Sequence, residues 1–239
     1  MSAQWVQTAK VSGGELARRV DDAKRIGGFT VILGAITMVV GTILWGTSGT
    51  DLWAALDGGD MVGYLAAVPG VQAQLVANLT VWILGVLILG VAGTLLVELC
   101  QQRPILAKVG LFCFRTAVPL VIVAYIAMLA VVVQLGGATD ETAVAIANTV
   151  GWIGARADDL ATALILGAGP LFIALAGRDE WVPKGLLRWS YVAAFAGLFS
   201  LVCLYIPGMG AYGFVIIPVG LIWMIATGVV LLRGRETAV

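Results

Sequence analysis

The sequence predicts an all-α fold, a polytopic membrane helix bundle with six transmembrane helices, cytoplasmic termini and short outer amphipathic helices. Three observations predict it. Hydrophobic residues make up 60% of the 239-residue chain and charged residues only 12%, whereas ordinary globular chains carry about 25% charged residues. Six apolar stretches reach or approach the roughly 20 residues that cross a bilayer. The basic residues also gather in alternate loops, as they do in membrane proteins.

The spans and the segments between them follow in order along a single membrane domain that covers 1–239. We expect spans at about 26–46, 75–99, 107–135, 158–177, 187–206 and 212–232. We expect residues 1–25 to form a cytoplasmic amphipathic arm, in which Leu16 and Val20 lie opposite a basic face. No apolar run precedes the first span, so we expect that span to remain in the mature protein. Residues 47–73 mix apolar side chains with three aspartates, which predicts a short outer helix. Residues 138–159 either extend the fourth helix outward or form a separate outer helix.

The distribution of charge predicts the orientation. Twelve of the fourteen basic residues lie in the arm, in the loop between spans two and three, in the loop between spans four and five, and in the tail. The opposite loops hold Arg156 and seven acidic residues: Asp51, Asp57, Asp60, Asp140, Glu141, Asp158 and Asp159. Because basic residues of membrane proteins stay on the cytoplasmic side, both termini should be cytoplasmic. The predicted partner at that face is a bilayer with anionic headgroups, which the basic arm would attract.

Tryptophan and glycine residues predict how the bundle is placed in the membrane and how its helices pack. Trp45, Trp53 and Trp152 should form an outer interfacial belt, with Trp181 and Trp189 in an inner one. Glycines such as Gly34, Gly41, Gly85, Gly90 and Gly93 should let neighbouring helices approach closely. The short cytoplasmic loops predict that spans two and three, and spans four and five, are antiparallel neighbours.

Composition excludes several functions. Lys+Arg and Asp+Glu number 14 each, which excludes a basic nucleic-acid-binding protein. The chain has no histidine, which removes His-dependent nucleophiles, haem ligation and His-based zinc sites. Cys100, Cys113 and Cys203 are expected to be reduced packing residues. The sequence therefore predicts no catalytic residue, no cofactor and no metal, and it argues against an enzyme.

Arg115 is the residue that most directly suggests a polar site. It lies about one and a half turns inside the third span, where a charge is costly unless it meets a partner, a cavity or the interface. Pro119 cannot donate to the carbonyl of Arg115, which leaves an acceptor free. Arg115 either serves as an internal cation for an anionic headgroup or substrate, or it snorkels to the cytoplasmic interface or pairs with Glu98. Its depth favours the inward orientation.

The fourth span holds the other candidate site residues. Asp158 and Asp159, preceded by Arg156, lie at its outer mouth, where they form a proton or cation site or simply stabilise a helix N-terminal end. Pro170 cannot bond to the carbonyl of Leu166, so the helix should bend or open there. Broken helices line transporter sites, but they also occur in ordinary membrane bundles.

Short motifs along nearly the whole chain resemble a bacterial family of six-helix integral membrane proteins classed as a domain of unknown function. These motifs are Arg18-Arg19…Ala23-Lys24-Arg25-Ile26-Gly27-Gly28, Arg103-Pro104…Leu106-Ala107, Leu111-Phe112…Phe114-Arg115 and Trp181-Val182-Pro183-Lys184-Gly185-Leu186-Leu187. In the family an acidic residue often follows the Phe-Arg pair, whereas Thr116 follows it here. The resemblance implies a six-helix fold and a location in the bacterial cytoplasmic (inner) membrane, and it implies no reaction.

These observations lead to two functional predictions from different classes. The first is a non-enzymatic accessory, scaffold or lipid-interacting subunit, packed with other membrane subunits or with copies of itself. The alternative is a small transporter or channel with a polar site at Arg115 and the helix broken at Pro170. A hydrated cavity that reaches Arg115 would favour the transporter, and a filled core would favour the scaffold.

Overall fold

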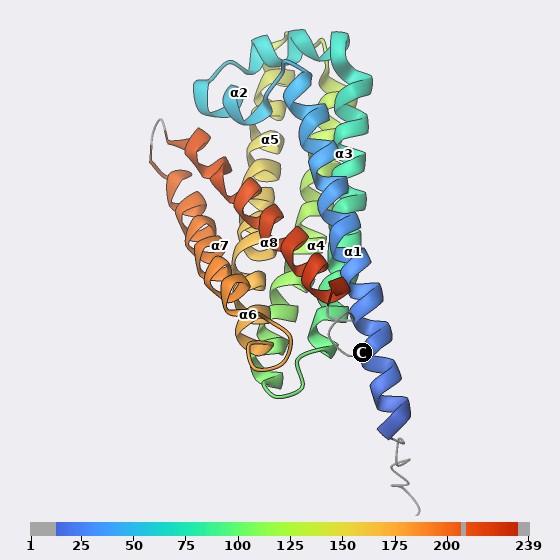
Figure 1. Cartoon of the computed structure of the whole chain (residues 1–239). Helices are drawn as coiled ribbons and strands as arrows, with labels where there is room; N and C mark the ends of the chain where they lie inside the picture. Colours follow the sequence, from blue (N-terminus) through green and yellow to red (C-terminus); the bar gives the residue numbers. More distant parts are fainter. Residues whose placement is uncertain (1–12, 207–208, 234–239) are drawn as a thin grey trace, which may run out of the picture.

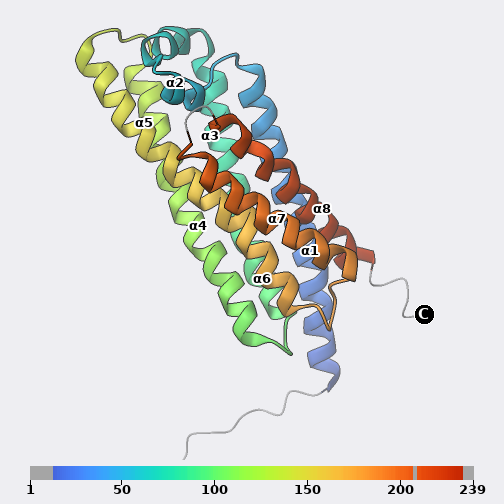
Figure 2. The ribbon, with the colours of Figure 1, turned by 90° about the vertical axis from the view of Figure 1, so that its left-hand side faces the viewer.

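The structure is a computed structural model that describes residues 13–206 and 209–233, and these residues form helices and loops with no strand. Figures 1 and 2 show an elongated bundle of long helices. Six helical stretches are long and apolar enough to cross a membrane: Val20–Thr47, Met61–Glu98, Pro104–Leu135, Glu141–Ala176, Lys184–Cys203 and Gly210–Arg233. The predicted all-α bundle with six spans is therefore confirmed, and the chain is a multi-pass membrane protein.

Eleven helical elements make up the described chain. The α-helices are α1 (Gly13–Thr47), α2 (Leu52–Gly58), α3 (Met61–Glu98), α4 (Pro104–Ala130), α5 (Glu141–Thr162), α6 (Gly169–Ala176), α7 (Lys184–Cys203) and α8 (Ile216–Arg233). Two π-helical segments, η1 (Val131–Leu135) and η2 (Ala163–Ala168), follow α4 and α5, and a 3₁₀ segment, η3 (Gly210–Val215), precedes α8. Contacts join α3 to α4 and α6 to α7, so the predicted neighbours are confirmed.

The two ends of the bundle differ in charge. We call the end that holds the start of α1, the α3–α4 loop, the α6–α7 loop and the end of α8 the basic end (Figure 1). Its described basic residues are Arg18, Arg19, Lys24, Arg25, Arg103, Lys108, Arg178, Lys184, Arg188 and Arg233. The other end, built from residues 48–60, 136–159 and 209–216, is the acidic end. Residues 1–12 of the predicted arm, with Lys10, and Arg235 of the tail lie outside the described residues.

The second spanning helix is longer than the sequence suggests, because it begins at Met61 rather than near 75. Polar side chains in the added turns and directly after them bond to other helices. Gln72 Nε2 donates to the Val132 carbonyl (3.0 Å), Gln74 Nε2 to the Leu44 carbonyl (2.8 Å) and Asn78 Nδ2 to the Gly41 carbonyl (2.8 Å). Because these amides are satisfied within the bundle, the helix continues through a stretch whose composition resembles a loop.

Residues 138–159 take the first of their two predicted forms and extend the fourth spanning helix. Helix α5 continues through η2 into α6, over Glu141–Ala176. Pro170 interrupts the regular ladder as expected, since the Gly169 N–H bonds to the Leu164 carbonyl five residues earlier. The helix therefore opens into a π-helical segment next to the proline.

Small residues let the helices approach each other in the core. Gly41 of α1 lies directly against the indole of Trp82 on α3, where a Cβ atom would collide with the ring. Gly167 in η2 and Gly197 in α7 face each other, and a Cβ atom on either glycine would press against backbone atoms of the other helix. Large side chains fill the rest, and Phe114, Leu89 and Trp223 are fully buried. This packing holds the helices that carry the site in place.

Candidate functional site

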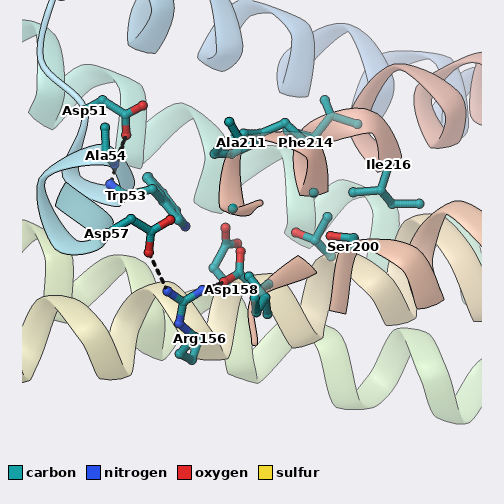
Figure 3. A pocket seen from close by; sticks show the side chains of 16 residues that line it. Asp51, Trp53, Ala54, Asp57, Arg156, Asp158, Ser200, Ala211, Phe214 and Ile216 are labelled. Atoms are coloured by element: carbon teal, nitrogen blue, oxygen red, sulfur yellow. Dashed lines mark hydrogen bonds and ion pairs between the residues drawn. The ribbon is translucent and has the colours of Figure 1, made fainter. Parts of the chain in front are cut away.

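A cavity of about 220 Å³ opens at the acidic end between α2, α5, α7 and η3. Figure 3 shows the side chains that line it, with α2 on one side and Ser200, Phe214 and Ile216 on the other. Its charged lining residues are Asp51, Asp57, Arg156, Asp158 and Asp159. Four carboxyl groups therefore meet one guanidinium, which makes the cavity suited to a cation.

Helix α2 forms one wall, and Asp51 sets where it begins. The Asp51 carboxylate caps α2 by accepting hydrogen bonds from the N–H groups of Trp53 (2.9 Å) and Ala54 (3.2 Å). Burial raises the pKa of Asp51 above its ordinary value. Gly59 ends the helix in the left-handed conformation, with φ of 72°. These two caps turn the short helix back onto the bundle, with Trp53 buried beneath it.

Arg156 joins α5 to α2. Its guanidinium donates to Asp159 (2.9 Å) and to Asp57 (3.1 Å), and it lies 5.9 Å from the ring centroid of Trp152. The Arg156 side chain is 18% exposed. Two of the four carboxylates are thus neutralised by a single partner.

Asp158 is different from its neighbours. It is only 8% exposed, and its Oδ1 atom is buried without a hydrogen-bond partner among residues 13–206 and 209–233. Around it lie Tyr125 of α4 and Thr162, one turn further along α5. A buried polar atom with no partner costs free energy, so such atoms are rare in folded proteins. The arrangement leaves an acceptor ready for a donor that enters the cavity.

A smaller cavity of about 30 Å³ lies deeper in the bundle and shares five lining residues with the first: Trp53, Asp158, Thr162, Phe214 and Ile217. Its walls are mainly the rings of Trp45, Trp53, Trp82 and Phe214, which we call the aromatic cluster, with Tyr125 stacked on Trp82 at 5.4 Å. Ring centroids within the cluster lie 5.3 to 6.4 Å apart where they pack. Asp158 therefore sits at the junction of a polar cavity and an aromatic one.

The interfacial belt predicted for the outer tryptophans is wrong for two of them. Trp53 is 8% exposed and Trp45 is half-buried, and their rings pack edge to face at 6.2 Å. The reason is that α2 folds back over the bundle and brings Trp53 inside. Trp152 alone of the three is exposed.

The structure separates the predicted site residues into two groups. Asp158 and Asp159 come together in the cavity. Arg115 is exposed on the same outward stripe of α4 as Phe112 and Pro119, and it makes no ion pair or hydrogen bond with the described residues. Its expected inward orientation is therefore wrong. The alternative of a pairing with Glu98, which is exposed at the end of α3, is wrong as well.

Pro170 is buried at the start of α6 and lines neither cavity. Its effect on the site is indirect, through the π-helical segment that directly follows Thr162.

Sequence reasoning missed most of the aromatic residues at the site. Trp82, Tyr125 and Phe214 come from three different spans, and their meeting depends on tertiary packing. The signal that could have pointed to the site is local: Trp53 lies among the aspartates 51–60, in a segment that faces Asp158 and Asp159.

Comparisons with protein families, with curated proteins and with solved structures each find no match for this chain. Within 13–206 and 209–233, no group of three or more His, Cys, Asp or Glu side chains is placed to hold a metal ion. The chemistry of the site therefore has to be read from its own residues. These residues offer a buried carboxylate with one oxygen that has no partner among the described residues, a carboxylate paired with Arg156, and a set of aromatic surfaces.

Proposed function

We propose that this multi-pass membrane protein binds a small cationic solute at its acidic end and acts as a small transporter for that solute. One observation carries the proposal: Asp158 is buried at the junction of two cavities with an oxygen that has no partner in the described chain. A cation that reached this atom would remove the cost of the unpaired acceptor. Asp158 and Asp159 thus take the place that the sequence suggested for Arg115.

The proposal includes the orientation. Both termini lie in the cytoplasm of a bacterium, and the acidic end faces outward from the inner membrane. The supporting observation is the distribution of basic residues in the described chain. Ten of them lie at the basic end, and Arg156 is the single described basic residue at the acidic end. The net negative charge of the acidic end would then attract cations from outside.

Irregular helices beneath the cavity support movement of the solute. The π-helical segment η2 begins immediately after Thr162, which lines both cavities, and Pro170 follows it. π-helical turns and discontinuous helices often occur next to functional sites, because their backbone changes shape more easily than a regular helix. The close contact of Gly167 with Gly197 lets η2 shift against α7 without a side chain in the way.

An accessory or scaffold subunit is the second candidate, and one observation favours it. Helix α1 exposes a stripe of large apolar side chains: Ile26, Phe29, Leu33, Ile36, Val40 and Ile43. Their spacing alternates between three and four residues, which is the spacing of helices that pack along a seam. Such a stripe suits a helix of another membrane subunit or a second copy of this chain.

The test uses purified protein reconstituted in liposomes and adsorbed on a solid-supported membrane. Concentration jumps of sodium, potassium, ammonium, ethanolammonium and tetramethylammonium chloride are applied, and the charge displaced is recorded. We expect at least one cation to displace charge, and we expect Asp158→Asn to abolish the signal. The matched control is Asp140→Asn, since Asp140 is an exposed N-cap at the same end and asparagine caps a helix equally well.

The control variant should behave as the unchanged protein does. If no cation displaces charge, or if the signal persists in Asp158→Asn, the transporter proposal is wrong and the accessory subunit becomes the better explanation.

A further inference from the structure

We infer that the solute is a small organic monocation, an amine or quaternary ammonium with alkyl groups on its nitrogen, and that it binds between Asp158 and the aromatic cluster. This inference rests on the proposed function and names its substrate class. It follows from the juxtaposition of one unpartnered carboxylate with aromatic rings that line the same two cavities.

The charge of the ligand follows from the pairing inside the cavity. Arg156 bonds to Asp57 and Asp159, so these two carboxylates already have a cationic partner. Asp51 accepts two main-chain N–H groups at the start of α2. Asp158 is the lining carboxylate whose buried Oδ1 has no such bond within the described residues. One available carboxylate matches a ligand with a single positive charge.

Aromatic surfaces favour a cation that carries alkyl groups. Trp53 and Phe214 line both cavities beside Asp158, with ring centroids 6.3 Å apart and planes inclined at 74°. Trp45 packs against Phe214 at 5.3 Å and holds that ring in place. Ammonium groups with methyl or alkyl substituents bind on such rings through cation–π attraction and through burial of apolar surface.

A metal ion fits the same surroundings poorly. Hard cations such as Ca²⁺ take six to eight oxygen ligands, and Mg²⁺ takes six. The described residues contain no cluster of three or more acidic, His or Cys side chains that could hold a metal. The other neighbours of Asp158 in the deep cavity are mainly ring and aliphatic carbons. These groups cannot replace the water that a metal ion would lose.

The size of the cavities limits the ligand. The deep cavity of about 30 Å³ holds about two waters, so the ammonium group belongs at the junction, where Asp158 lines both cavities. The remainder of the ligand would occupy the outer cavity of about 220 Å³, toward Ser200 and Ala211. This volume is below the range of drug-sized ligand sites, roughly 300 to 1,000 Å³, so the ligand has few non-hydrogen atoms.

An alkylammonium group could come from a free solute or from a lipid headgroup, since phosphatidylethanolamine and phosphatidylcholine both carry one. The test therefore uses protein in nanodiscs of phosphatidylglycerol, which has no amine. Tetramethylammonium, choline, ammonium and sodium chloride are titrated separately, and the heat of binding is measured. A second set of nanodiscs made with phosphatidylcholine tests whether the headgroup blocks the site.

We expect tetramethylammonium and choline to bind more tightly than ammonium, with no heat from sodium. Asp158→Asn should weaken tetramethylammonium binding about 100-fold or more, because it removes the charge that faces the ligand. Phe214→Leu should weaken tetramethylammonium about tenfold and leave ammonium nearly unchanged. The matched control is Phe195→Leu, because Phe195 is 70% exposed on α7 away from the cavity. Thermal unfolding of each variant shows whether it is folded.

The outcomes separate the two proposals. Loss of the tetramethylammonium signal in phosphatidylcholine nanodiscs would keep the alkylammonium class and assign the source to the lipid headgroup. Sodium or ammonium binding that depends on Asp158, with no binding of tetramethylammonium, would overturn the ligand class and leave the proposed function standing. Absence of Asp158-dependent binding by any cation would overturn both.

Discussion

The two ends of the bundle use acidic side chains in opposite ways. At the basic end, Asp179 in the α6–α7 loop accepts from Arg103 in the α3–α4 loop at 2.7 Å. Glu180 beside it accepts the main-chain N–H groups of Gln101 (3.1 Å) and Gln102 (2.7 Å). These acidic residues are exposed, and together they join two loops. These two carboxylates are therefore satisfied by partners within the protein.

At the acidic end, Asp158 is buried and its Oδ1 has no partner in the described chain. An exposed, paired carboxylate is worth little to stability, and replacing it changes little. A buried, unpaired carboxylate lowers stability, and proteins keep such groups where function needs them. This contrast is the reason why we place the proposed binding site at the acidic end and give the carboxylates of the basic end a structural role.

The first prediction is all-or-none and concerns which end faces outward. An introduced cysteine at Asp140 should react with a membrane-impermeant maleimide in intact cells, and one at Asp179 should not. Both positions are exposed at opposite ends of the bundle. The native Cys100 should stay silent, because it is 3% exposed and burial raises its pKa to about 11. Labelling at position 179 in intact cells would reverse the orientation.

The second prediction compares one carboxylate from each end. Asp158→Asn should raise the free energy of unfolding by about 1 to 3 kcal/mol, because an unpaired buried charge is removed. Asp179→Asn should lower it by less than about 1 kcal/mol, since its ion pair is exposed. Unfolding in mild detergent, followed by circular dichroism, measures both. A marked loss of stability in Asp158→Asn would mean that this group is structural.

The third prediction compares the two arginine bridges. Arg156→Gln should destabilise the protein by about 2 kcal/mol, because it leaves Asp57 and Asp159 without a cation in a site where Asp159 is 13% exposed. Arg103→Gln should cost less than about 1 kcal/mol, since Arg103 is 32% exposed. The same unfolding measurement serves both variants. Equal effects would show that burial does not distinguish the two bridges.

The smallest effect is expected at Arg115. Because its side chain lies on the exposed face of α4, Arg115→Lys should leave both cation binding and thermal stability nearly unchanged. Lysine also reaches the interface with its flexible stem, so the change keeps the charge and the location. Calorimetric titration with tetramethylammonium measures the effect on binding. A tenfold loss of affinity for tetramethylammonium would show that Arg115 contributes to the site.

Much of the fold could be predicted from the sequence because each spanning helix carries its own signal. Length and hydropathy located the six spans, and the caps at Asp51 and Asp140 involve only local residues. Asp158 and Asp159 were also recognised as candidates, because they are two adjacent carboxylates at the outer mouth of the fourth span. These features depend on neighbours in the chain.

The remaining features of the site depend on which face of each helix points into the bundle. The sequence of a membrane helix indicates this poorly, because its lipid-facing side and its inward-facing side are both apolar. Around α4 nearly every side is apolar, so the depth of Arg115 could be judged but its direction could not. The aromatic cluster was hidden for the same reason, because Trp45, Trp82 and Phe214 look like any other apolar residues of their spans. Packing of α1, α3 and η3 against one another brings these three rings close to Asp158, and the folding of α2 over the bundle adds Trp53.

The π-helical segment η2 also sets the rotational phase of the helix on its two sides. A π turn contains one residue more than an α turn, so side chains beyond it are rotated by roughly 100° relative to an unbroken helix. With this shift, Pro170, Ile173 and Ala174 of α6 keep the same inward direction as Asp158 of α5, and all four are buried. Deleting one residue from Ala163–Ala168 would turn that face of α6 toward lipid while Asp158 stayed in place. The extra residue of the π turn therefore keeps one continuous buried face along the two halves of this spanning helix.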